Sequence, residues 1–298
     1  MTARIVPIMA GGGTRLPAHI GILTALEALN IEFDHIVGVS GGSIVASLYA
    51  SGMSLSKIKD IALSTEFSRF REFSLFKLVR NGGLSSGDLF EQWVDELLGG
   101  KTFKEMALDL HVVATDVKSG KPVIFDAQRT PDMKVSMAVR FSMSIPLVFS
   151  FKPFGKRIMV DGSILSEDAL HRDWDLQGTP VLCFRLRGEQ EYDDLNVSGI
   201  FPIFNYVTLL IRTFMTTISR EYINEAFWHN TIIINTGDTS AVDFNMTNEQ
   251  KQRLFDVGYN TALEVIPIKT GVTINRETKT VATKSNELEN ISKQTVNT

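Results

Sequence analysis

The stretch "HIVGVSGGSIVASLY", His35–Tyr49, places a serine among small residues where the sequence pattern changes, and this change decides the fold. The apolar residues of Phe33–Gly38 predict a buried strand, whereas the residues after Ser40 follow a helical pattern. Between them, Gly38–Gly42 has the form G-x-S-x-G, whose glycines permit a turn sharp enough to expose the serine above a sheet. Because Gly41 begins the helix, its N–H and the helix dipole favour negative charge beside the hydroxyl. Ser40 is therefore a candidate nucleophile.

Another strand and helix precede this elbow. Ile5–Ala10 predicts a buried strand that stops at three glycines, and Pro7 within it favours a late start or an edge position. Pro17–Leu29 has apolar residues at helical spacing, with the proline in the first turn. This alternation indicates a βαβ unit and an α/β fold with a mainly parallel central sheet. Further strands of that sheet are expected at Leu110–Ala114, Val123–Phe125, Arg157–Val160, Val181–Arg185 and Thr231–Asn235, with a closing helix at Asn248–Ile266.

The composition limits the domain organisation. No internal repeat or linker divides the first 270 residues, which predicts one domain over residues 1–270. Residues 271–298 lack aromatic side chains and are rich in Thr, Asn, Lys and Glu, so we expect a polar, mobile tail. The one cysteine, Cys183, excludes an internal disulfide and a thiolate metal cluster.

Charge and hydropathy limit the partners. A net charge of −4 favours no nucleic acid partner, because such binding usually needs a basic face. No stretch reaches the roughly 18 to 20 apolar residues of a membrane span. The nearest candidate, Gly199–Ser219, contains Asn205 and Arg212. We therefore expect a cytoplasmic protein whose contact with a membrane is peripheral and transient.

A run of glycines ends the first predicted strand. Gly11, Gly12 and Gly13 are followed by Thr14 and Arg15. A dinucleotide fingerprint needs glycine at its sixth position, where this chain has Leu16, and the Gly-Lys-Ser/Thr of a P-loop is absent. Consecutive glycine N–H groups can form a nest for an anion, which predicts an oxyanion hole beside the elbow. Arg15 could lie near a lipid phosphate or could pair with a surface carboxylate.

The base that would activate the serine has two candidates. In a Ser-His-Asp arrangement, His171 or His229 could close a triad, although that fold places several strands before its nucleophile. The remaining histidines, His19, His35 and His111, show no spacing typical of a base or ligand. Alternatively, the predicted strand Arg157–Val160 delivers Asp161 to a turn at Gly162, at the same edge of the sheet as the elbow. Apolar surroundings would raise the pKa of that carboxyl and make it a better base, whereas an ordinary Asp-Gly turn is the structural alternative.

Together, these three motifs resemble the patatin-like phospholipase family. The resemblance implies a three-layer α/β/α domain with Ser40 as nucleophile, Asp161 as base and a glycine-rich oxyanion loop. It extends over "GGLSSGDLFEQWVDELLGGKTFKEM", "AVRFSMSIPLVFSFKPFGKRIMVDGS" and "NEQKQRLFDVGYNTALEVI", and thus over about residues 5–266. The chain departs from the family pattern at Ala10, at Leu16 followed by Pro17, and at Ser163, where glycine or alanine is usual. None of these changes removes a catalytic group, but those in the loop bear on the shape of the oxyanion hole.

The family's reaction releases fatty acids from phospholipids or other acyl lipids through an acyl-enzyme, with no cofactor and no metal, hence without calcium. The same acyl-enzyme could pass its acyl group to an alcohol, and an impaired site could merely sense lipid; a conventional triad esterase is a further alternative. Phenylalanines recur every three residues from Phe67 to Phe76 among basic residues. That segment could contact an anionic bilayer or act as a lid, or it could be an amphipathic helix covering the core.

Overall fold

The computed structural model of the chain describes residues 3–70, 83–162, 172–188, 229–241 and 243–271. Hydrogen bonds connect the strands of its eight-stranded main sheet along the path β10-β9-β1-β2-β4-β8-β7. β2 and β8 pair with one edge of β4, and β5 pairs with the other edge. The bounds are β1 Val6–Ala10, β2 His35–Val39, β4 Asp109–Asp116, β5 Lys121–Phe125, β7 Lys152–Phe154, β8 Arg157–Val160, β9 Val181–Arg187 and β10 Thr231–Asn235. A separate two-stranded sheet pairs β3, Gly83–Ser85, with β6, Leu147–Phe149.

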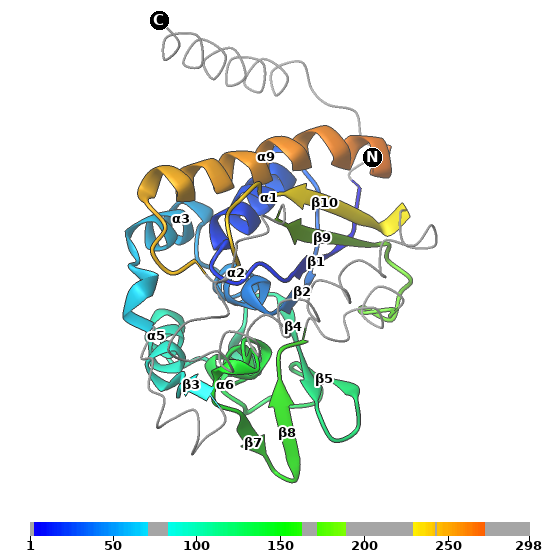
Figure 1. Cartoon of the computed structure of the whole chain (residues 1–298). Helices are drawn as coiled ribbons and strands as arrows, with labels where there is room; N and C mark the ends of the chain where they lie inside the picture. Colours follow the sequence, from blue (N-terminus) through cyan, green and yellow to red (C-terminus); the bar gives the residue numbers. More distant parts are fainter. Residues whose placement is uncertain (1–2, 71–82, 163–171, 189–228, 242, 272–298) are drawn as a thin grey trace, which may run out of the picture.

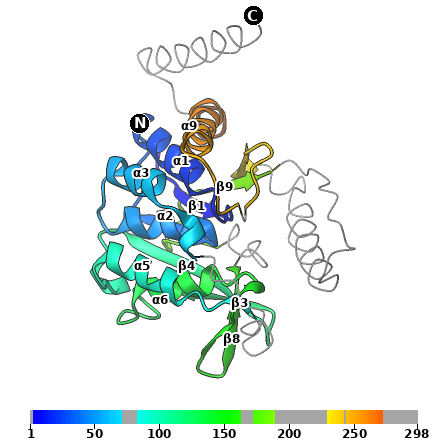
Figure 2. The same ribbon diagram turned by 60° about the vertical axis from the view of Figure 1, so that its left-hand side comes forward.

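Helices cover this sheet, and the predicted α/β fold is confirmed (Figures 1 and 2). Their bounds are α1 Leu16–Ala28, α2 Gly41–Ala50, α3 Leu55–Ser64, α5 Asp88–Leu98, α6 Val135–Ser142 and α9 Asn248–Thr270, with short 3₁₀ helices η1 Phe67–Phe70 and η2 Phe103–Glu105. Both figures show α9 lying alongside α1. The closing helix runs one turn beyond its predicted end and stops at Gly271, whose φ is +71°.

The sheet is parallel from β10 to β4, as predicted, but not throughout. β1 pairs in parallel with β2 and β9, so Pro7 lies in a central strand and not at an edge. In a parallel sheet, the backbone hydrogen bonds of a central strand alternate between its two neighbouring strands. The missing N–H of Pro7 therefore removes only one hydrogen bond of the ladder. β5 and β8 run antiparallel to β4, which corrects the expectation of parallel strands there.

The central strands β1, β2 and β4 are buried on both faces, as expected for parallel strands with continuous apolar runs. Ile5 and Met9 belong to a large cluster with the helices, whereas Val6, Ile8 and Ala10 belong to a smaller one. The alternation follows from side chains pointing to opposite faces along a strand. The predicted tail and the candidate span at residues 199–219 lie outside the described residues.

Candidate active site

Ser40 stands in a strained turn between β2 and α2. Its φ of +53° and ψ of −133° lie in a region that residues with a Cβ rarely adopt, at a cost of about 1 to 3 kcal/mol. It is the N-cap of α2, so the positive end of the helix dipole lies beside its hydroxyl. Its own N–H donates to Ser142 Oγ at 2.8 Å and therefore cannot serve a substrate.

Glycines make this tight turn possible. A Cβ added to Gly38 would lie 2.5 Å from Ser43 Cα, and one added to Gly42 would lie 2.1 Å from Met9 O. Both separations are far below van der Waals contact, so α2 can begin this close to β1 and β2 only with glycine at these positions. The glycines that the G-x-S-x-G pattern singles out are thus explained by packing around the serine.

Asp161 meets Ser40 because two strands share one edge of β4. β2 pairs with β4 up to Val39, opposite Val113, and the antiparallel β8 pairs with β4 down to Val160, opposite Thr115. β5 occupies the other edge of β4, so β2 and β8 point toward one another along the same edge. Ser40 and Asp161 are the residues that follow the two strand ends, where the strands nearly meet.

The side chains of these two residues form a short hydrogen bond. Ser40 Oγ donates to Asp161 Oδ2 at 2.6 Å, and both residues are buried. Gly162 allows the approach, since a Cβ there would lie 2.1 Å from Val113 O. A carboxylate that accepts this proton can act as a general base toward the serine hydroxyl.

The end of α6 and the residues just after it contact both groups. Ser142 Oγ accepts from Ser40 N–H and donates to Val113 O at 2.6 Å. Two residues later, Ser144 O accepts from Asp161 N–H at 3.0 Å. This short segment therefore fixes the backbone of the serine and of the aspartate relative to one another. Nothing in the sequence pattern distinguishes Ser142 from other helical serines, and sequence reasoning missed it.

The glycine loop lies against the elbow, but only part of it can bind an oxyanion. Gly11 N–H donates to Val39 O at 3.0 Å, Thr14 N–H to Ala241 O at 2.9 Å and Arg15 N–H to Gly12 O at 2.9 Å. These three amides are therefore not available to a substrate, which corrects the expectation that the whole loop donates. Within the described part of the chain, the N–H groups of Gly12 and Gly13 have no backbone acceptor.

Gly13 lies against the start of α2. A Cβ added to Gly41 would lie 2.5 Å from Gly13 O and 2.6 Å from Gly13 N. The two backbones thus approach as closely as two glycines permit, and the amides of Gly12, Gly13 and Gly41 are the candidate donors. Leu16 and Pro17, where the chain departs from the family pattern, form the first turn of α1 and leave this contact intact.

Arg15 points inward and not toward a phosphate or a surface carboxylate, contrary to both expectations. Its Nη1 donates to Thr236 Oγ1 at 2.7 Å and its Nε to Gly12 O at 3.2 Å. Burial lowers the pKa of the guanidinium to about 10. Arg15 thus ties the glycine loop to the loop after β10.

An apolar cavity of about 30 Å³ opens next to the glycine loop. Gly13 and Thr14 line it on one side, and its apolar walls include Phe67, Phe70, Phe90, Met143, Phe149 and Phe244. Met143, one of the lining residues, has its Sδ 3.9 Å from Ser40 Oγ, so this side chain lies between the cavity and the candidate nucleophile. Phe67 and Phe70 are buried here, as the core alternative predicts, and the rest of their segment lies outside the described residues.

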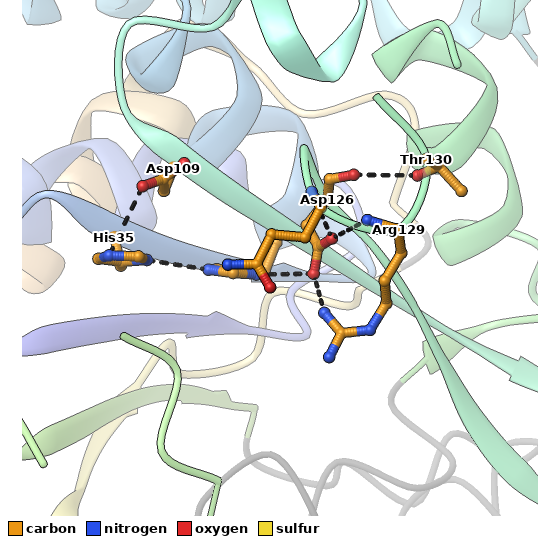
Figure 3. A network of polar contacts seen from close by, with 7 residues as sticks. His35, Asp109, Asp126, Arg129 and Thr130 are labelled. Carbon is orange, nitrogen blue, oxygen red and sulfur yellow. Dashed lines mark hydrogen bonds and ion pairs between the residues drawn. The ribbon is translucent and has the colours of Figure 1, made fainter. Parts of the chain in front are cut away.

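The described histidines do not bond to Ser40. His35 and His111 lie near the amino end of β2, where His35 Nδ1 is 3.1 Å from His111 Nε2 and His111 Nδ1 is 3.3 Å from Asp126 Oδ2 (Figure 3). His229 is exposed and is the first described residue after the gap at residues 189–228, and His171 falls outside the described residues. His19 contacts the glycine loop and not the serine.

The described residues lack two further features. No cluster of three or more His, Cys, Asp or Glu side chains there could hold a metal ion. No helix among them combines the length and the hydropathy needed to cross a bilayer.

Comparison with known proteins gives consistent matches. The sequence profile of a family described as patatin-like phospholipase matches residues 8–171. The uncharacterized protein YqhO of Bacillus subtilis is 27% identical over 278 residues, covering 84% of this chain and 94% of that protein. The uncharacterized protein R571 of Acanthamoeba polyphaga mimivirus is 27% identical over 275 residues, covering 87% and 92%. The crystal structure of VipD from Legionella pneumophila has the same fold, with a TM-score of 0.60 and 16% identity over 89% of this chain and 67% of that one.

Proposed function

The chain belongs to the patatin-like phospholipase family, whose members are lipid hydrolases, and from this premise we propose that it is a phospholipase A or lysophospholipase that works through a Ser40–Asp161 dyad. The observation that carries the proposal is the 2.6 Å hydrogen bond from Ser40 Oγ to Asp161 Oδ2. Met143, which contacts Ser40 Oγ, also lines an apolar cavity. A hydroxyl held by a carboxylate, with no imidazole bonded to it among the described residues, favours the dyad over the triad.

In the proposed reaction, Asp161 accepts the Ser40 proton while Ser40 Oγ forms a bond to the ester carbonyl carbon. The negative charge on the carbonyl oxygen is stabilised by the N–H groups of Gly12, Gly13 and Gly41. Collapse of this intermediate breaks the ester bond, and the departing alcohol takes the proton from Asp161. An acyl group then remains on Ser40.

Water completes the cycle in the second half of the reaction. Asp161 takes a proton from the water while the water oxygen attacks the acyl carbon. The proton then passes from Asp161 to Ser40 Oγ as the fatty acid leaves. Every proton transfer uses Asp161, so the scheme requires no metal and predicts activity in the presence of a calcium chelator. The apolar side chains of Phe70, Phe90 and Phe149, which line the cavity next to the glycine loop, would contact the acyl chain, while the protein contacts the membrane surface transiently.

The test is fatty-acid release from mixed phospholipid vesicles, followed by mass spectrometry. The unmodified chain should release fatty acid and should react at Ser40 with a fluorophosphonate, whereas Ser40→Ala should do neither. His229→Gln and His171→Gln should keep their activity, and a loss in either variant would favour a triad.

Adding an alcohol such as glycerol separates hydrolysis from acyl transfer, because transfer would replace free fatty acid by a new ester. A chain that binds the vesicles without releasing fatty acid would instead be a lipid sensor.

A further inference from the structure

His19 is a fully buried histidine of α1 that the proposed reaction does not use. Its Nε2 lies 3.0 Å from Gly11 O, and a carbonyl oxygen can only accept, so Nε2 carries the hydrogen. Its Nδ1 has no hydrogen-bond partner within the described residues. Burial lowers the pKa of this imidazole to about 4, and the ring is therefore neutral at physiological pH. His19 is thus a donor with one fixed tautomer.

The carbonyl that His19 contacts belongs to the peptide before Gly12. Gly11 O accepts from Gly42 N–H at 2.9 Å as well as from His19, and Gly11 N–H donates to Val39 O. In a planar trans peptide, the C=O of one residue and the N–H of the next point in opposite directions. Any group that fixes the direction of the Gly11 carbonyl therefore also fixes the direction of Gly12 N–H.

Two hydrogen bonds to one carbonyl also polarise its peptide. Polarisation strengthens the donor at the other end of the same unit, which is Gly12 N–H. The imidazole packs directly on this residue, since a Cβ added to Gly12 would lie 3.2 Å from His19 Nε2. Gly12 has a φ of +109°, a conformation that is open to glycine because it has no Cβ.

We propose that His19 is a positioning residue that orients the Gly11–Gly12 peptide, so that Gly12 N–H is available to a substrate oxyanion. The inference rests on the proposed acyl hydrolysis, and it assigns to the histidine the role of a fixed hydrogen-bond donor and not that of a base. Gly11 O is thus held by two donors, Gly42 N–H at the start of α2 and His19 Nε2 of α1.

Two polar replacements of different length test the proposal. In His19→Gln the side-chain amide can place its nitrogen near the position of Nε2, whereas in His19→Asn it reaches only to the position of Nδ1. We expect His19→Asn to lower kcat for a soluble acyl ester by about tenfold to a hundredfold with KM within about twofold, and His19→Gln to recover most of that loss. His111→Gln and His111→Asn, made in the other buried histidine, should leave kcat unchanged.

Thermal unfolding of all variants and a Ser40→Ala reference complete the experiment. Equal kcat values for the parent and both His19 variants would overturn the proposal. The proposal would also fail if both variants lost the same fraction of kcat and their melting temperatures fell in parallel with it. If the unmodified chain cleaves no ester, or if Ser40→Ala cleaves it as well as the parent, the proposed function itself fails. A failure confined to the His19 pair removes only the positioning role.

Discussion

At the carboxyl end of β2, Asp161 accepts a hydrogen bond from Ser40, and near the amino end of the same strand Asp126 bonds to His111. Both carboxylates are buried. The two regions differ in what surrounds them. Beside Asp161 lie a helix N-terminus, glycine amides and an apolar cavity, whereas Asp126 also binds the guanidinium of Arg129 in an ion pair (Figure 3).

This difference indicates that the position of a polar pair in the sheet, more than its side-chain types, decides whether its surroundings suit a reaction. The amino-end cluster has imidazoles and a carboxylate, the groups expected of an acid–base pair, but the ring of His111 packs against Trp174 with centroids 4.9 Å apart. Burial opposes ionisation of Asp126, yet hydrogen bonds from His111 and Arg129 outweigh it and lower the pKa of that carboxyl. In open α/β sheets, ligands bind outside the carboxyl ends of the strands, and Ser40 and Asp161 lie at such an end.

The largest expected effect comes from the same substitution in the two carboxylates. Asp161→Asn should lower kcat for ester hydrolysis by about a thousandfold, because an amide cannot accept the serine proton. Asp126→Asn should leave kcat within about twofold but should lower the free energy of unfolding by about 2 kcal/mol, since His111 and Arg129 lose a charged acceptor. Steady-state kinetics and urea unfolding of both variants measure this. A comparable loss of activity in Asp126→Asn would show that the two regions are not independent.

A smaller effect is expected where the glycine loop meets the elbow. In Gly41→Ala, the new Cβ would lie 2.5 Å from Gly13 O and would separate the candidate oxyanion donors, so kcat should fall about a hundredfold. Gly99 is the matched control, because its φ is +64° and a Cβ there would meet nothing within 4 Å. Gly99→Ala should lower the free energy of unfolding by about 1 kcal/mol and leave kcat unchanged. Equal losses of kcat in the two variants would argue against an oxyanion hole between these glycines.

The sequence predicts the first half of this region well, because its signals are local. The strand, turn and helix around Ser40 lie within about fifteen residues, and periodicity with glycine placement is enough to locate them. Asp161 lies at the edge that the sequence predicts, but the expectation that its strand is parallel is wrong, because β8 runs antiparallel to β4. What brings Asp161 to Ser40 is the sharing of one β4 edge by β2 and β8, and no periodicity encodes that.

The glycine loop marks the limit of local reasoning. Its sequence shows where amides are plentiful, but whether an amide is free depends on acceptors far along the chain. The N–H of Thr14 is taken by Ala241 O, and the guanidinium of Arg15 is directed to Thr236. Such long-range partners are set by tertiary packing, and for that reason three of the five predicted loop positions proved to have committed amides.

An intermediate effect is expected from the serine that holds the elbow. Ser142→Ala removes the acceptor of Ser40 N–H and should lower kcat about tenfold, because the strained turn loses one of its fixed bonds. Ser47 is an equally buried helical serine, and among the described residues its hydroxyl bonds only to Ile44 O in its own helix. Ser47→Ala should therefore leave kcat unchanged. If both variants lose activity alike, the loss reflects packing and not the placement of Ser40.

The smallest effect concerns the pH dependence at the amino end. Burial lowers the pKa of His35 in the fold, so the unfolded chain binds a proton more readily near its ordinary value of about 6.5. His35 therefore adds stability above about pH 6.5, and this contribution is lost as the pH falls through the lower folded pKa.

In His35→Gln, the free energy of unfolding should fall less steeply between about pH 6.5 and pH 5 than in the parent, while kcat at neutral pH is unchanged. Urea unfolding at several pH values measures the slopes. If the free energy of unfolding changes with pH in the same way in the parent and in His35→Gln, protonation of His35 does not affect stability. A changed kcat would instead connect the amino-end histidines to the reaction.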